Sequence, residues 1–215
     1  MTEPGAPDGR DVSADRALQL RGLRRAALIV AALNLSYFFV EFAVASAIGS
    51  ASLMADSVDF LEDTAINVLI ALAVALPLAR RAIAGRAMAL IILVPAVAAG
   101  WLVVQKALDP VAPDVLALVV TAGGAAVVNL VSALVLVRHR RTGGSMGRAA
   151  FLSARNDVLV NLAIIAMGLV TWLTRSGWPD IVLGAFIVGI ALHAAWEVWG
   201  AAGEERLLAK ELERP

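Results

Sequence analysis

The sequence predicts an all-α polytopic membrane protein, a bundle of six transmembrane helices. Of its 215 residues, 60% are hydrophobic and only 17% are charged, and the mean hydropathy is +0.81. Six stretches are each apolar over the roughly 20 residues that a helix needs to cross a bilayer. The connections between them are short, so the chain has almost no room for a soluble domain. Any function must therefore reside in the helices.

The predicted spans divide the chain into three parts. They cover residues 26–48, 51–78, 87–108, 115–137, 149–174 and 181–200. We expect a polar N-terminal tail (1–25), one six-helix transmembrane domain (26–200) and a short polar C-terminal tail (201–215).

The distribution of basic residues predicts the orientation of the bundle. Arginines and one lysine gather in both tails and in the second and fourth loops, whereas the alternate loops carry only Lys106 and Arg175. Because loops rich in Lys and Arg stay on the cytoplasmic side, we expect both termini and the even-numbered loops to be cytoplasmic. The expected location is the cell membrane, in a multi-pass arrangement.

The strongest functional signal is a group of acids in the second span: Asp56, Asp59, Glu62 and Asp63. A charged side chain at bilayer depth costs at least about 2.5 kcal/mol, so such acids usually face a bundle interior or an aqueous cavity. Asp59 and Asp63 lie one helical turn apart, and two carboxylates with this spacing can bind one divalent cation. Asp56 shares their face but lies near the outer end of the span, where it would also suit a helix cap.

The fifth span supplies a second polar stripe. Ser153, Asp157 and Asn161 follow one another at intervals of four residues, and Asn156 lies alongside Ser153. A polar stripe in an apolar span should face other helices or a cavity. Asp157 is the best candidate for a third acidic ligand, with Ser153 and Asn156 as further oxygen donors. The chain has no cysteine, which excludes a thiolate site.

Polar residues in other spans have weaker interpretations. Asn34 and Glu41 share one face of the first span and are expected to support the cavity, although Glu41 could instead carry a proton. His193 and Glu197 have the spacing of a metal pair, but a single histidine on an apolar helix is more often hydrogen-bonded within the packing. Arg155 is expected to reach the cytoplasmic interface or to pair with Glu62.

Three sequence runs resemble the cation diffusion facilitator, or cation efflux, family of proton-coupled divalent metal exporters: NLSYFFVEF, GSASLMADSVDFLED and ARNDVLVN. The resemblance implies that Asp59 and Asp63 match the ligand pair of span two and that Asp157 matches a ligand of span five. Ser153 stands where that family usually has His or Asp. Only about 15 polar residues follow Gly200, so the chain is most similar to a short bacterial branch without the C-terminal cytoplasmic domain. A homodimer is left open.

Together these features predict a divalent metal cation transporter that exports metal from the cytoplasm in exchange for protons. Oxygen ligands suit magnesium and manganese, while the resemblance keeps zinc and cobalt among the candidates. Crowded carboxylates in a low-dielectric cavity cannot all stay charged, so metal binding should release protons. The metal ion is then cargo. We expect no enzymatic activity, no prosthetic group and no nucleic acid partner; the lipid bilayer is the surrounding partner.

A second hypothesis is a non-transporting membrane protein whose buried acids pair with Arg155 and asparagines to specify helix packing and assembly. The predicted spans also raise a geometric difficulty. Asp63 falls near the middle of the second span and Asp157 near the cytoplasmic end of the fifth, a difference in depth of about 10 Å at 1.5 Å per residue. Unless helix tilt or different helix ends remove this difference, the two acids cannot form one site.

Overall fold

The computed structural model describes residues 9–73, 78–139 and 144–212, and within these ranges it is helical with no strands. The helices are α1 (Gly9–Ile48), α2 (Ala51–Ala73), α3 (Leu78–Leu108), α4 (Val115–Leu136), α6 (Gly144–Thr174) and α7 (Trp178–Leu212). This confirms the predicted all-α class. Asp109 to Asp114 separate α3 from α4 as expected, and the Asp114 side chain accepts a hydrogen bond from the main-chain N–H of Ala117 (2.9 Å), which caps α4.

Five of the helices contain a stretch that is long and apolar enough to cross a membrane: Leu18–Ile48, Ala89–Leu108, Val115–Leu136, Ala150–Thr174 and Trp178–Glu197. The helix α2 has a similar length but carries the four acids, so its composition does not qualify. It contacts α1, α3, α6 and α7, and most of its side chains are buried. The helix that carries the four acids is therefore shielded from lipid by the others.

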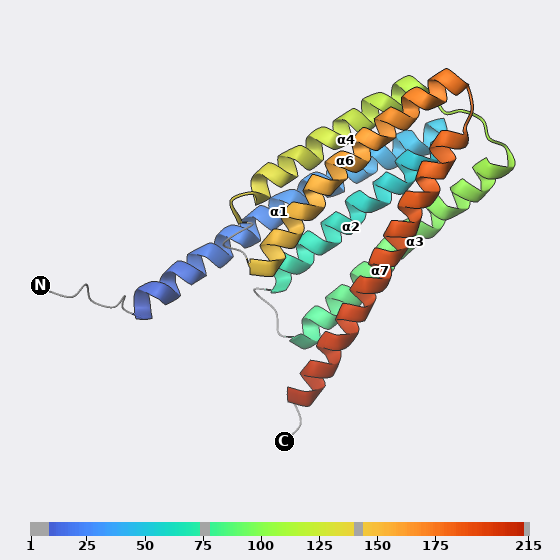
Figure 1. Ribbon diagram of the computed structural model, residues 1–215. Helices are drawn as coiled ribbons and strands as arrows, with labels where there is room; N and C mark the ends of the chain where they lie inside the picture. Colours follow the sequence, from blue (N-terminus) through green and yellow to red (C-terminus); the bar gives the residue numbers. More distant parts are fainter. Residues whose placement is uncertain (1–8, 74–77, 140–143, 213–215) are drawn as a thin grey trace, which may run out of the picture.

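The helices form two groups (Figure 1). One group consists of α1, α2, α4 and α6, while α3 and α7 run side by side along α2. Toward the end of the bundle at which α1 begins and α7 ends, α3 and α7 diverge from α2 and α6. The other end is closed more tightly around the start of α2.

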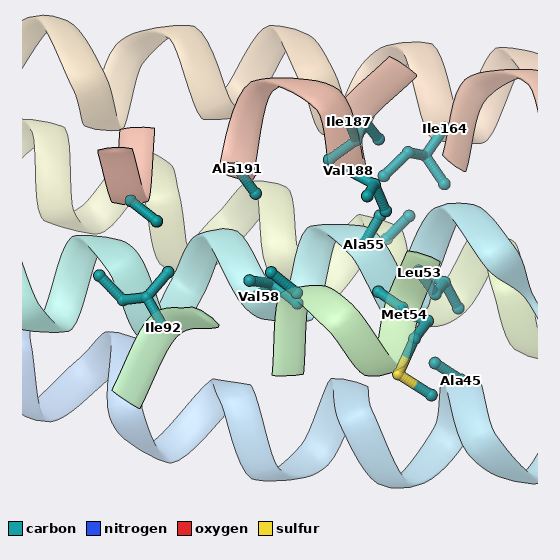
Figure 2. Close-up of a cluster of buried hydrophobic side chains, with 14 of the residues drawn as sticks. Ala45, Leu53, Met54, Ala55, Val58, Ile92, Ile164, Ile187, Val188 and Ala191 are labelled. Atoms are coloured by element: carbon teal, nitrogen blue, oxygen red, sulfur yellow. The ribbon is translucent and has the colours of Figure 1, made fainter. Parts of the chain in front are cut away.

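The hydrophobic core surrounds the first half of α2 (Figure 2). Leu53, Met54, Ala55 and Val58 of α2 pack there against buried side chains of the neighbouring helices. These partners are Ala45 of α1, Ile92 of α3, Ile164 of α6, and Ile187, Val188 and Ala191 of α7. The core fixes the first half of α2 against four helices, and the acids Asp59, Glu62 and Asp63 follow directly after it.

The apolar parts of α3, α4 and α6 (Ala89–Leu108, Val115–Leu136 and Ala150–Thr174) closely match the predicted third, fourth and fifth spans. The helices themselves reach beyond the spans: α3 begins at Leu78 and α6 at Gly144, and α2 is described as far as Ala73. Arg80, Arg86 and Arg148 therefore lie on helices and not in loops. In the same way α1 extends back to Gly9 and α7 continues to Leu212. Hydropathy detects only the membrane-embedded part of a helix, while alanine and arginine favour helix beyond it. Arg140 and Arg141 lie outside the described residues.

Candidate metal site

Asp63 lies where four helices meet. Its Oδ1 accepts a hydrogen bond from Ser153 Oγ of α6 (2.9 Å), and its Oδ2 accepts one from Asn34 Nδ2 of α1 (3.1 Å). The Oδ1 of Asn34 in turn accepts a hydrogen bond from Ser132 Oγ of α4 (3.4 Å). Asp63, Asn34 and Ser132 are buried. One carboxylate thus connects α2 to α1, α6 and, through Asn34, α4.

The contact between Asp63 and Ser153 removes the difficulty in depth. Ser153 Oγ lies 2.9 Å from Asp63 Oδ1, although Ser153 is near the start of the apolar part of α6 (Ala150–Thr174). The two residues consequently lie at the same level, and Asp157 follows one turn later along α6. The residues of the second and fifth spans can therefore belong to one site.

Asp59, Asp63 and Asp157 form a carboxyl cluster between α2 and α6. The side chain of Asp157 interacts with those of Asp59 and Asp63, and its Oδ2 has no hydrogen-bond partner among the described residues. Asp63 and Asp157 are buried, whereas Asp59 is partly exposed. No three His, Asp or Glu side chains in the described ranges are gathered closely enough to hold a metal as they stand.

A second pair of carboxyl groups, Glu41 of α1 and Asp56 of α2, lies beside this cluster. Both side chains are fully buried, and none of their four oxygens accepts a hydrogen bond from the described residues. Asp56 therefore does not cap its helix, which begins at Ala51. An unpaired buried carboxylate is costly, so this pair is satisfied best when one carboxyl holds a proton and donates it to the other.

A family model for the cation efflux transmembrane domain matches residues 27–202, which include the whole carboxyl cluster and the Glu41–Asp56 pair. The chain belongs to the cation efflux family. This confirms the resemblance in the sequence, and it makes the protein a multi-pass membrane protein that transports metal cations. A comparison with curated proteins finds no match.

In this cation efflux protein the remaining predicted residues divide into two groups. Asn161 is buried, donates to the main-chain oxygen of Asp157 (3.0 Å) and lies near Asp56. Glu62 is half-buried and faces Asp59 and Asp63. Asn156, by contrast, is exposed and accepts a hydrogen bond from the Arg155 guanidinium (3.2 Å), so the structure does not bring it to the cluster.

Two polar side chains of the cation efflux protein lie apart from the cluster. His193 Nε2 is 3.4 Å from Glu197 Oε1, and the two side chains are 73% and 71% exposed on α7. The expectation that His193 is held within the packing was therefore wrong. Arg155 makes its hydrogen bond to Asn156 and not to Glu62, which leaves the carboxyl cluster without that predicted cation.

Asp180 was not among the predicted functional residues; it directly precedes the predicted sixth span. Asp180 is fully buried near the start of α7, and its carboxylate caps the N-terminus of α2. It accepts hydrogen bonds from Ser50 Oγ (2.7 Å), Ala51 N (2.7 Å), Ser52 N (3.1 Å) and Ser52 Oγ (2.6 Å). The Ser-Ala-Ser sequence before α2 is a helix-capping signal, but it does not reveal an acceptor almost 130 residues away.

Proposed function

We propose that this cation efflux protein exports a divalent metal from the cytoplasm in exchange for protons. The observation that supports this most directly is the contact of Asp63 with Ser153 (2.9 Å), with Asp59 and Asp157 as immediate neighbours. This arrangement brings carboxylates of α2 and α6 together inside a membrane bundle. Charged groups in such a place usually serve ion transport and not packing.

The proposed ligands are Asp59, Asp63, Asp157 and Ser153. All of them offer oxygen, and three negative charges suit a divalent cation better than a monovalent one. Manganese matches this donor set best, whereas zinc and cobalt are proposed from family resemblance. Asn156 would have to leave Arg155 before it could join the ligands, so we assign it no direct role in this conformation.

Proton exchange follows from the chemistry of the same groups. Metal binding requires deprotonated carboxylates, so a metal ion and protons compete for the cluster. We propose that Glu41 and Asp56 hold protons beside the ligands, since these two carboxyls are buried and lack other donors. Asn34 and Asn161 orient the acids on either side, and Glu62 extends the acidic surface toward α7.

Alternating access is supported by the arrangement of the helices. Helices α3 and α7 diverge from α2 and α6 at the end where α1 begins (Figure 1). That end carries Arg25, Arg80, Arg138 and Arg148, so we propose that it faces the cytoplasm and that metal enters there. Rocking of α3 and α7 against the other helices would then expose the cluster to the opposite side.

The proposed orientation places both termini in the cytoplasm and the protein in the cell membrane. Residues 26–200 would form the transport domain, with cytoplasmic segments before and after it. A homodimer is a further prediction, which cross-linking in native membranes would test.

The packing hypothesis has one observation in its favour. Asp63 bonds to Ser153 and Asn34 and so helps to specify how α1, α2 and α6 meet. The packing hypothesis does not explain why Glu41 and Asp56 are buried without hydrogen-bond partners. It also does not explain why Arg155 bonds to Asn156 and not to one of the acids. Transport accounts for both.

Proteoliposomes with an imposed pH gradient test the proposed function. Manganese, zinc, cobalt, cadmium and magnesium would be supplied to the wild type, Asp59→Asn and Asp157→Asn. Loss of a ligand should lower the transport rate at least about tenfold. Asp109→Asn, an exposed acid in the linker before α4, is the matched control and should transport normally. Wild-type flux in both ligand variants would refute the proposed site.

A further inference from the structure

A basic groove lies between α1 and α4, at the end of the bundle where α1 begins. It has a volume of about 540 Å³. Its polar part is formed by Arg25, Arg138 and His139, and its apolar wall includes Ile29, Val131 and Leu134. Arg25 directly precedes the apolar part of α1, and Arg138 follows the end of α4, so both cations lie at the same membrane boundary.

A second groove, of about 440 Å³, continues the first along α1. The two share Arg25 and Ile29, and the second adds Arg21 and Arg24 above another apolar wall. Among the residues that the structure describes, no acid lines either groove. Positive charge therefore gathers at one level, with a continuous apolar surface directly beneath it.

His139 closes the groove against α1. A Cβ atom added to Gly22 would lie 3.2 Å from His139 Nε2, which shows how closely the ring approaches this helix. The Nδ1 of His139 is buried and has no hydrogen-bond partner among the described residues.

We propose that this groove binds one anionic phospholipid, whose phosphate lies between Arg25, Arg138 and His139. One acyl chain would run along Ile29, Val131 and Leu134. The groove is lined by cationic side chains at the membrane boundary and by apolar side chains toward the membrane centre. A phospholipid has its charged headgroup and its acyl chains in the same order. Arginine also recognises phosphate oxygens through several hydrogen bonds at once. This proposal is independent of the transported ion and of proton exchange.

Native mass spectrometry of the full chain tests the proposal, with phosphatidylglycerol and phosphatidylcholine offered in equal amounts. The wild type should retain phosphatidylglycerol in preference to phosphatidylcholine. Each lost arginine should weaken that preference about fivefold, so Arg25→Gln combined with Arg138→Gln should weaken it about 25-fold. Arg148→Gln, an exposed arginine at the same end but outside both grooves, is the control and should behave as the wild type.

The Val131→Trp variant distinguishes lipid binding in the groove from lipid binding to a basic surface. The bulky ring would fill the apolar wall while every positive charge remains, and Val131 is partly exposed, so the substitution does not disturb the core. The variant should lose retained phosphatidylglycerol, whereas its thermal unfolding in phosphatidylcholine should match the wild type. Unchanged retention in Val131→Trp or in the double arginine variant would overturn the proposal. So would displacement of the lipid by millimolar inorganic phosphate alone, because a free anion would then be the ligand.

Discussion

At the scale of single residues, Ser153 is the informative departure from the family pattern. Its hydroxyl donates to Asp63, so it occupies the level at which a ligand from α6 would meet α2. An imidazole at this position would add a nitrogen donor to an oxygen site. Nitrogen ligands favour zinc and cobalt over manganese.

Ser153→His should therefore shift transport toward zinc. The expected change is a ratio of zinc to manganese flux about tenfold higher than in the wild type, measured in proteoliposomes with both ions present. Ser36→His, on an exposed position of α1 where the hydroxyl bonds only to its own helix, is the control and should leave the ratio unchanged. An unaltered ratio in Ser153→His would mean that this residue does not line the metal path.

Glu41→Gln should weaken proton coupling while metal binding persists. Glutamine has nearly the same size but cannot carry the exchangeable proton, and Glu41 is not among the proposed ligands. In the wild type, metal affinity should fall as pH falls, because protons then occupy the carboxylates. The variant should release fewer protons per metal bound, measured with a pH-sensitive dye in weak buffer.

The control for Glu41→Gln is Glu204→Gln, which neutralises an exposed acid on α7. It should release as many protons as the wild type. If Glu41→Gln did the same, Glu41 would have no part in the coupling.

The sequence predicts which acids share a helix face, but it does not predict how their neighbours are oriented. Helical periodicity places Asp59 and Asp63 on one face, and the structure brings Ser153 and Asp157 to that face. Asn156 lies between the polar stripe and Arg155, and spacing alone does not decide which of them it joins. In the structure the side chain of Asn156 is exposed and bonds to the Arg155 guanidinium.

At the scale of helices, α2 depends on contacts that come from α7. Asp180 satisfies two main-chain N–H groups and two hydroxyls at the start of α2. Without it, several buried donors at this helix end would lose their acceptor, each at a cost of about 1–3 kcal/mol. A carboxylate is also favourable beside the positive end of the helix dipole.

Asp180→Ala should accordingly destabilise the protein by about 2–4 kcal/mol, measured by thermal unfolding in detergent. Asp114→Ala is the comparison, because Asp114 caps α4 through one exposed hydrogen bond and its loss should cost only about 1 kcal/mol. Equal effects of the two substitutions would show that the burial of Asp180 adds nothing to its cap.

Gly184 permits the close packing of α7 on α2. A Cβ atom at this position would lie 2.6 Å from the carbonyl carbon of Ala51, and main chain cannot move aside as a flexible side chain can. Gly184→Ala should therefore push the two helices apart and lower the unfolding temperature. Gly189→Ala, on the same helix with nothing within 4 Å of the added atom, should be neutral or stabilising by up to about 1 kcal/mol. A wild-type unfolding temperature in Gly184→Ala would contradict this account.

At the scale of the whole molecule, fold class was the easiest feature to predict. The bilayer core offers no water to satisfy main-chain polar groups, so an apolar chain with helix-length spans must be helical. Which helices pack together was not predictable, because lipid-facing and protein-facing surfaces are both apolar. Only the structure shows that α3 packs on α7 and that Ser153 lies at the same level as Asp63.

The direction of transport depends on which end of the bundle faces the cytoplasm. The absence of native cysteine allows this to be tested with single cysteines at two exposed positions, Val111 and Arg148, on opposite ends of the bundle. A membrane-impermeant maleimide added to intact cells should label Val111→Cys and leave Arg148→Cys unlabelled, because arginine-rich segments stay in the cytoplasm. Permeabilised cells should show both labelled. The reverse pattern would place the arginine-rich end outside, and the divergence of α3 and α7 would then open the carboxyl cluster to external metal.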